Sequence, residues 1–443
     1  MKSLSPTCLI LCLASLHGAA ISVSAQENRF SQQALTVFEL PEAAPFPSVP
    51  SENSGPIEAD QGYAGEPLFC SPQAACDASF AGSGGCGERR FFGNGEPFDL
   101  GETLLGPKSD WDIGGWVSFG FSTANDGVFA TYPGHFQNNQ TNIFVEKIAD
   151  GSRGLGFGGR VDVMYGTDAS NTQSFGNHPG RFDFHNNYGV YDWAVPQLYA
   201  EVAYEKLSVK LGHFYTLLGY QVVPSTGNFF YSIPYTFNFG EAFTHTGALA
   251  TYQATDRVTV YGGYTFGWDT GFDQFNGGSS FLGGTSIQVV DDLTVTYILT
   301  AGNLGWIGNG YSHSVVVDYV INDKWEYVIQ SDLDSMNNSP NGSAGAGTHY
   351  SAIGVNQYLF YTINDHLKAG ARVEWWKANG TSMQEMAYGL NIRPLPNLLL
   401  RPEVRYNWSN GIPGFLPTVA PNAAALANYT SNCLFMMDAV VTF

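Results

Sequence analysis

The C-terminal end of the chain alternates between two kinds of position. One face is apolar and holds Phe435, Met437, Ala439, Val441 and Phe443, while the residues between them are Met436, Asp438, Val440 and Thr442. A period of two residues predicts a β-strand. This strand runs through the last residue, although the termini of soluble domains usually fray. A strand that closes a barrel in lipid has to stay paired to its end, so we expect the last strand to close a lipid-embedded barrel.

The same alternation recurs upstream in segments about as long as a membrane-spanning strand. The first runs from Trp111 to Phe121, with Ile113, Val117 and Phe119 on its apolar face. A transmembrane strand needs roughly 9 to 11 residues. Further alternating segments lie at 155–165, 258–268, 293–301 and 367–375.

Short and long connections alternate between these strands. Short ones lie near 150–151, 205–206, 255–256, 291–292, 322–323, 364–365 and 394–396. Longer, polar or glycine-rich ones lie at 122–140, 166–194, 217–242, 269–278, 303–309, 334–346, 378–383 and 409–430. Eight long and seven short connections join about 16 strands, and we allow roughly 14 to 18. A set of short turns at one end and long loops at the other is typical of an all-β, antiparallel up-and-down transmembrane barrel. A β-propeller would instead repeat four strands per blade.

The region before the barrel is expected to contain two parts. Lys2, an apolar run over 9–16 and the small residues before Gln26 predict a signal peptide over 1–25 that is removed on export. Residues 26–109 are rich in Pro, Gly, Ala and Ser and predict a flexible low-complexity periplasmic segment. The barrel then occupies 110–443. No later stretch approaches the roughly 20 apolar residues of a membrane helix.

Composition agrees with a barrel and excludes one class of partner. The chain has 52 Gly, 31 Phe, 24 Tyr and 9 Trp, and only 13% of its residues are charged. Glycine and aromatic residues suit alternating barrel strands with aromatic girdles at the interfaces. The net charge of -20 argues against nucleic acid, whose phosphates require a basic surface. We attribute most of this charge to acidic external loops.

The sequence predicts no metal or other cofactor. Cys70, Cys76 and Cys86 lie in one irregular segment and Cys433 begins the last strand, with no spacing typical of a zinc site. Disulfides between Cys70 and Cys76 or between Cys76 and Cys86 are both open, because spacing does not fix the pairing.

The sequence also predicts no catalytic site. His245, His313 and His349 stand near Ser or Thr, as a hydrolase would require. No nucleophile elbow or paired carboxylates accompany them. We therefore expect these histidines to lie at the wet ends of strands.

The third long connection, 217–242, carries an unusual number of rings for an exposed loop. Either it folds into the barrel and narrows it, or its rings belong to the outer aromatic girdle of longer strands. Its candidate residues for a constriction are Tyr220, Gln221, Phe229, Phe230, Tyr231, Tyr235, Phe237, Phe239 and Glu241.

Charged residues on the inward face are candidates for a pore wall. Charged side chains are unfavourable in lipid, so the alternation of faces along each strand is enough to assign these residues to the lumen. Basic residues gather on the last strands, at Lys368, Arg372, Arg393, Arg401 and Arg405, although Glu374 and Glu403 lie among them. The remaining candidates are Arg160, Asp162, Glu201, Asp318, Glu326 and Asp332. A basic ladder that faces acids predicts a transverse field across a pore, although the clustering by sign is also compatible with chance.

Five stretches give the chain a resemblance to a known family. They are Gly159–Ala169, Pro196–Val202, Gly212–Tyr215 followed by Gly219-Tyr220, and His245–Gly247. In this order they resemble the putative β-barrel porin-2 family of bacterial outer membranes, over roughly 110–443. Gln221 departs from the acidic residue that the resemblance leads us to expect after Gly-Tyr.

The resemblance implies a pore-forming barrel in the outer membrane, and the lack of a catalytic motif leads us to expect no enzyme. We expect passive diffusion of small hydrophilic solutes. The alternatives are a solute-selective channel, for example for sugars, a structural or adhesive barrel and, last, a membrane-embedded hydrolase. Expected partners are outer-membrane lipid, the barrel assembly machinery, for which Phe443 is the candidate signal, and further copies of the chain in a homotrimer.

Overall fold

The computed structural model describes residues 97–124, 128–130, 132–174, 176–178, 180–184, 187–337, 349–409 and 431–443. The expected signal peptide and most of the expected flexible segment lie outside the described residues, as do Cys70, Cys76 and Cys86. Cys433 is disulfide-bonded.

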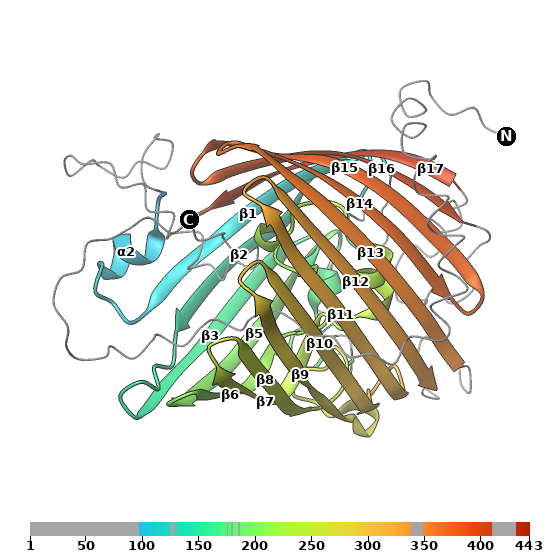
Figure 1. Ribbon diagram of the computed structural model, residues 1–443. Coiled ribbons are helices and arrows are strands. Elements are labelled where there is room, and N and C mark those ends of the chain that lie inside the picture. The colour runs from blue at the N-terminus through green and yellow to red at the C-terminus, as the bar shows by residue number, and fades with distance from the viewer. Residues whose placement is uncertain are drawn as a thin grey trace, which may run out of the picture.

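Sixteen strands form the wall of a closed antiparallel barrel, which confirms the predicted fold class and strand number (Figure 1). The strands are β1 (Asp112–Ser122), β2 (Phe136–Lys147), β3 (Leu155–Gly166), β5 (Tyr191–Tyr204), β6 (Leu207–Tyr215), β7 (Thr244–Thr255), β8 (Val258–Thr265), β9 (Ser279–Val290), β10 (Leu293–Asn303), β11 (Asn309–Asn322), β12 (Trp325–Asn337), β13 (His349–Asn364), β14 (Leu367–Ala378), β15 (Thr381–Leu395), β16 (Leu398–Ser409) and β17 (Ser431–Thr442). The two-residue strand β4 (Asn187–Tyr188) pairs with β5 inside a connection.

The first and last strands close the barrel. β1 pairs with β2 on one side and with β17 on the other. The seam extends to the last residue, because the backbone N–H of Phe443 donates to the carbonyl of Gly115 at 3.0 Å and the N–H of Gly115 donates back at 2.8 Å. A closed sheet has no free edge, as lipid requires.

The connections differ between the two ends of the barrel. At one end, which we call the short-turn end, two residues join β5 to β6 and two join β7 to β8, at 205–206 and 256–257. The turn between β2 and β3 is longer and spans 148–154. At the opposite, long-loop end lie connections such as 123–135, 167–190 and 216–243. This asymmetry is typical of outer-membrane barrels.

Side chains alternate between an apolar outer face and a buried inner face. Along β17, Phe435 and Met437 are exposed, whereas Met436 and Asp438 are buried. The same parity holds in β1, where Phe119 is exposed outward and Trp116 and Ser118 are buried. The outer face therefore suits hydrocarbon, and the inner face receives the polar residues.

Helices are short and lie in connections. They are α2 (Leu100–Leu105), α3 (Ala169–Thr172), α4 (Tyr235–Gly240), and the one-turn 3-10 helices η1 (Ser225–Gly227) and η2 (Phe275–Gly277). Among the described residues, no helix has the length and apolar character needed to cross a bilayer.

The sequence analysis predicted no element at α2. Its N-terminus is capped by Asp99, whose carboxylate accepts the N–H of Glu102 at 2.7 Å. Just before the helix, the side chain of Asn397 accepts the N–H of Phe98 and donates to its carbonyl, which ties the start of the described chain to the turn between β15 and β16.

Candidate functional site

The connection between β6 and β7, residues 216–243, folds into the space enclosed by the strands (Figure 1). We call it the inward segment. Most of its side chains are buried, including Leu218, Tyr220 and Gln221. It contains η1 and α4, and its contacts run along the wall from β12 through β17 to β1 and β2.

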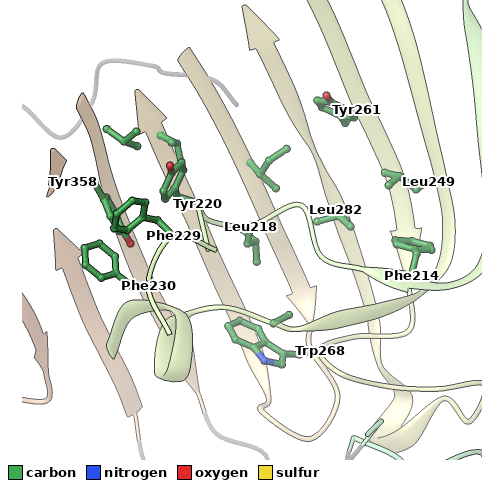
Figure 2. Packing of buried hydrophobic residues seen from close by; sticks show 14 of the residues in the cluster. Phe214, Leu218, Tyr220, Phe229, Phe230, Leu249, Tyr261, Trp268, Leu282 and Tyr358 are labelled. Carbon is green, nitrogen blue, oxygen red and sulfur yellow. The ribbon is translucent and has the colours of Figure 1, made fainter. Parts of the chain in front are cut away.

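The first part of the segment packs by its rings. Figure 2 shows Tyr220 and Phe229 next to Tyr358 of β13. The ring centroids of Tyr220 and Tyr358 are 4.8 Å apart. Those of Phe229 and Phe360 are also 4.8 Å apart. Edge-to-face and tilted pairs of this spacing add roughly 0.5–1.5 kcal/mol beyond burial.

Two glycines on the wall make room for these rings. A Cβ at Gly370 of β14 would overlap the ring of Phe229, and one at Gly389 of β15 would stand 3.2 Å from the ring of Phe230. Both glycines occupy inward-facing positions of their strands, where a larger residue would hold the segment away from the wall.

The middle of the segment reaches the other side of the seam. The hydroxyl of Tyr231 donates to Asn139 of β2 at 3.1 Å, and its ring lies against Gly120 of β1. Within the segment, Phe237 stacks on Phe243 with centroids 4.9 Å apart. The segment is therefore fixed to strands on both sides of the barrel closure.

Three buried arginines of the wall bind carbonyl groups of the segment. Arg372 of β14 donates to the carbonyl of Ser232 at 2.8 Å. Arg401 of β16 donates to the carbonyls of Ser225 at 2.8 Å and Asn228 at 2.5 Å.

The third arginine, Arg405 of β16, donates to the carbonyl of Ile233 at 2.6 Å. Guanidinium carries several donors in a fixed plane, so one side chain can bind the segment and a wall acid together.

Acidic wall residues hold these arginines. Glu385 of β15 lies between Arg372 and Arg405 and pairs with both. Asp438 of β17 binds Arg401 through two hydrogen bonds, of 2.8 and 2.5 Å. All five side chains are at most 2% exposed. The ladder is thus neutralised in place and does not face open water.

Two further carboxylates accept N–H groups of the segment. Glu374 of β14 accepts the N–H groups of Tyr235 and Thr236, both at 2.6 Å, at the first turn of α4. Glu403 of β16 accepts the N–H of Ser232 at 3.0 Å and the hydroxyl of the same residue. Charge-assisted bonds of this kind are roughly twice as strong as neutral ones.

Both ends of the segment rest on β12 through a different set of groups. Gln330 donates to Glu241 at 2.6 Å and to Asp332 at 2.9 Å. The side-chain amide oxygen of Gln330 accepts the backbone N–H of Tyr220 at 3.1 Å. Gly219 has a φ of +82°, and a Cβ there would overlap the Glu241 carboxyl, so glycine is required.

A part of the inner wall nearer the short-turn end stays partly exposed. Lys368 of β14 pairs with Glu326 of β12 at 2.8 Å, and their side chains are 24% and 14% exposed. On the other side, Arg160 of β3 pairs with Glu146 of β2 at 2.8 Å and with Asp162. Lys368, Glu326 and Glu146 are partly exposed, whereas Arg160 and Asp162 are buried like the arginine ladder.

The predicted wall residues thus fall into separate groups. Arg372, Arg401 and Arg405 bind the inward segment, whereas Arg160, Asp162, Glu201, Asp318, Glu326 and Lys368 lie toward the short-turn end. Asp332 lies beneath Glu241, where its carboxylate accepts the hydroxyl of Ser314 at 2.7 Å. Arg393 lies exposed near the end of β15, where its backbone N–H donates to the carbonyl of His366 in the turn between β13 and β14, so it does not extend the buried ladder.

Sequence reasoning did not single out several residues that complete this site. Glu385, Asp438, Gln330 and Ser232 are the partners of predicted residues, and Lys210 places its Nζ 4.6 Å from the ring centroid of Tyr199. For Glu385, Asp438, Gln330 and Lys210, the available signal was their position on the inward face of an alternating strand. Nothing in the sequence indicated which acid pairs with which arginine.

The histidines considered for catalysis lie on three different strands, and His245 is fully buried, contrary to the expectation that all three lie at wet strand ends. His245 has its Nε2 3.1 Å from the hydroxyl of Thr216 and its Nδ1 3.2 Å from the carbonyl of Gly267. His313 lies between the rings of Tyr297 and Tyr311, and His349 contacts Asn337 at 3.2 Å.

Comparison with known proteins identifies one matching family model. The model described as putative beta-barrel porin-2, OmpL-like, matches residues 110–443. No curated protein sequence matches the chain.

Solved structures of low sequence identity share the fold. The anion-selective porin from Comamonas acidovorans is 9% identical with a TM-score of 0.53, covering 75% of this chain and 99% of that one. The outer membrane channel DcaP of Acinetobacter baumannii is 10% identical with a TM-score of 0.50, covering 75% and 97%. At such identities the likeness concerns the barrel alone.

Proposed function

The chain belongs to the putative β-barrel porin-2, OmpL-like family, and we propose that it passes small hydrophilic solutes by passive diffusion through a passage that the inward segment narrows. It is a porin of the outer membrane. The short-turn end then faces the periplasm and the long-loop end faces outward, as in bacterial outer-membrane barrels generally.

The observation that carries the proposal is the anchoring of the inward segment. A 16-stranded barrel without an inward connection leaves an aqueous channel. Here Arg372, Arg401 and Arg405 bind carbonyl groups along the segment, and Glu374 and Glu403 accept its N–H groups. A segment tied at so many points keeps one position, so it sets the size of solute that passes.

Burial of the segment's rings bears on the sugar-channel alternative. A stacking track for sugars needs ring faces open to the passage. Phe229 and Phe230 are 5% and 1% exposed, and their faces are occupied by each other and by Phe360. This packing favours general diffusion over stacking-based selection.

The proposal includes two partners. We propose that Phe443 serves as a signal for the barrel assembly machinery, which is supported by its place at the closing seam against Gly115. We also propose a homotrimer, which the mass of the protein in a mild detergent tests by light scattering.

Planar-bilayer recording of the refolded mature chain tests the function. We expect stable conductance steps, and in liposome-swelling assays we expect permeation of small sugars with a sharp upper size limit. Deleting Asn228–Tyr235 should raise the conductance and this limit. Absence of conductance would favour a structural barrel, and hydrolysis of an ester or peptide that is lost on replacing His245 would favour an enzyme.

A further inference from the structure

We infer that the passage favours cations and that Asp318 of β11 is a specificity-determining residue. This inference rests on the proposed function. It concerns the sign of the charge that passes, which the size of the aperture does not determine.

The arginine ladder is unsuited to select anions because its charge is already matched. Arg372, Arg401 and Arg405 are at most 2% exposed, and each is bonded both to a wall side chain and to the inward segment. Buried acids outnumber these three arginines at this level of the lumen. They are Glu241, Asp332, Asp334, Glu374, Glu385, Glu403 and Asp438.

The partly exposed wall toward the periplasm also has more acids than bases. The inward-facing acids here are Asp112, Glu146, Asp162, Glu201, Asp318 and Glu326, and the bases are Arg160, Lys210, Lys368 and, at the rim, Arg393. Most of the bases have an acidic neighbour. Arg160 pairs with Glu146 and Asp162, and Lys210 stands in register with Glu201. The charges that remain uncompensated are therefore acidic.

Asp318 stands out among these acids. Its Oδ1 atom is shielded from solvent and has no hydrogen-bond partner. The nearest base, Lys368, is bonded to Glu326 at 2.8 Å and lies over the ring of Phe360. Glu326, Asp318 and Lys368 therefore form a group with one formal negative charge in excess.

This group lies next to the inward segment. Asp318 is in register with Val328, which belongs to the same buried cluster as Tyr220 of the segment. A solute that passes the segment therefore meets an uncompensated carboxylate at the narrow part of its route. Acid-lined constrictions favour cations, and low-dielectric walls strengthen the field of each charge. The favoured solutes are small cations and ammonium-bearing molecules.

Reversal potentials across a KCl gradient, recorded on the refolded mature chain in planar bilayers, test the inference. We expect the unsubstituted protein to prefer K⁺ over Cl⁻. Asp318→Asn should lower the permeability ratio by about two- to five-fold, as expected when one charge a few ångströms from the passing ion is removed in a polar medium. Lys368→Gln should raise the ratio, and molar salt should shrink both shifts through screening.

Asp323→Asn is the matched control. It removes the same charge from an exposed position in the turn between β11 and β12, outside the lumen, and should leave the ratio unchanged. If Asp318→Asn does not fold, Glu201→Gln should lower the ratio in the same way.

An anion preference of the unsubstituted protein would overturn the inference, as would equal effects of Asp318→Asn and Asp323→Asn. A complete lack of conductance would instead overturn the proposed function.

Discussion

Arg401 of β16 and Asp438 of β17 face each other in register, and their ion pair is enclosed within the barrel. The same guanidinium donates to the carbonyls of Ser225 and Asn228 in the inward segment. The pair thus joins the last two strands to a segment that enters the barrel from between β6 and β7. A charge that is buried and paired in this way is expensive to leave alone.

Arg401→Gln should therefore destabilise the protein by about 3–5 kcal/mol, since it leaves Asp438 buried without its partner. The free energy of unfolding in urea, measured in lipid vesicles, checks this value. Arg257→Gln is the control, because it breaks the exposed Arg257–Asp291 pair between two turns, and a surface pair contributes only about 0–1 kcal/mol. Equal losses in the two variants would contradict the anchoring role of Arg401.

Gly370→Ala should move the inward segment away from β14, because the new Cβ would overlap the ring of Phe229. We expect a loss of about 1–3 kcal/mol, typical of overpacking, together with a changed conductance. The matched control is Gly262→Ala in β8, where a Cβ meets no atom within 4 Å. An unchanged channel in both variants would show that the segment tolerates displacement at this point.

Asp269, in the connection between β8 and β9, should make stability depend on pH. Burial raises the pKa of its carboxyl to about 7, although the N–H groups of Phe243 and Thr244 bond to it at 2.7 and 2.9 Å. The folded state then favours the neutral acid over the charged one. This contribution is fully present below pH 3.8, the ordinary pKa, and is lost as the pH rises to about 7.

The comparison of wild type with Asp269→Asn isolates this effect. Between pH 4 and 8 the wild type should lose up to roughly 4 kcal/mol relative to the variant, given about 1.4 kcal/mol for each unit of pKa. Asp183, whose pKa burial raises to about 6, adds a contribution of the same sign to both proteins. Parallel unfolding curves at every pH would contradict the prediction.

Variants of Phe443 test how the barrel closes and how the assembly machinery recognises the last strand. Its backbone pairs with Gly115, and its ring lies over the same glycine. Deleting Phe443 removes both, whereas Phe443→Ala keeps the backbone pairing. If the ring is the assembly signal, both variants should accumulate in the periplasm instead of the outer membrane, as measured by fractionation and heat-modifiable mobility. Normal insertion of Phe443→Ala would assign the contribution to pairing alone.

The sequence by itself determined the wall of this barrel. Lipid on one side and water on the other impose a period of two on every spanning strand, and that pattern gives both the strands and the side that each residue faces. Phe435 and Asp438 illustrate this, since their parity predicted the outward and inward positions that the structure has. The alternation of short turns and long loops determined the strand number.

The interior was decided by tertiary structure alone. Its bonds join residues far apart in the sequence, for example Arg372 to Ser232, separated by 140 positions, and Arg401 to Ser225, separated by 176. Inward parity shows that an arginine has to avoid lipid, but it does not show whether the partner is water, a solute or a folded segment. The period of two along a strand does not indicate which of these partners an inward side chain has. The partner depends on the path of the inward segment, and the strands that flank this segment, β6 and β7, lie across the barrel from the arginines that bind it.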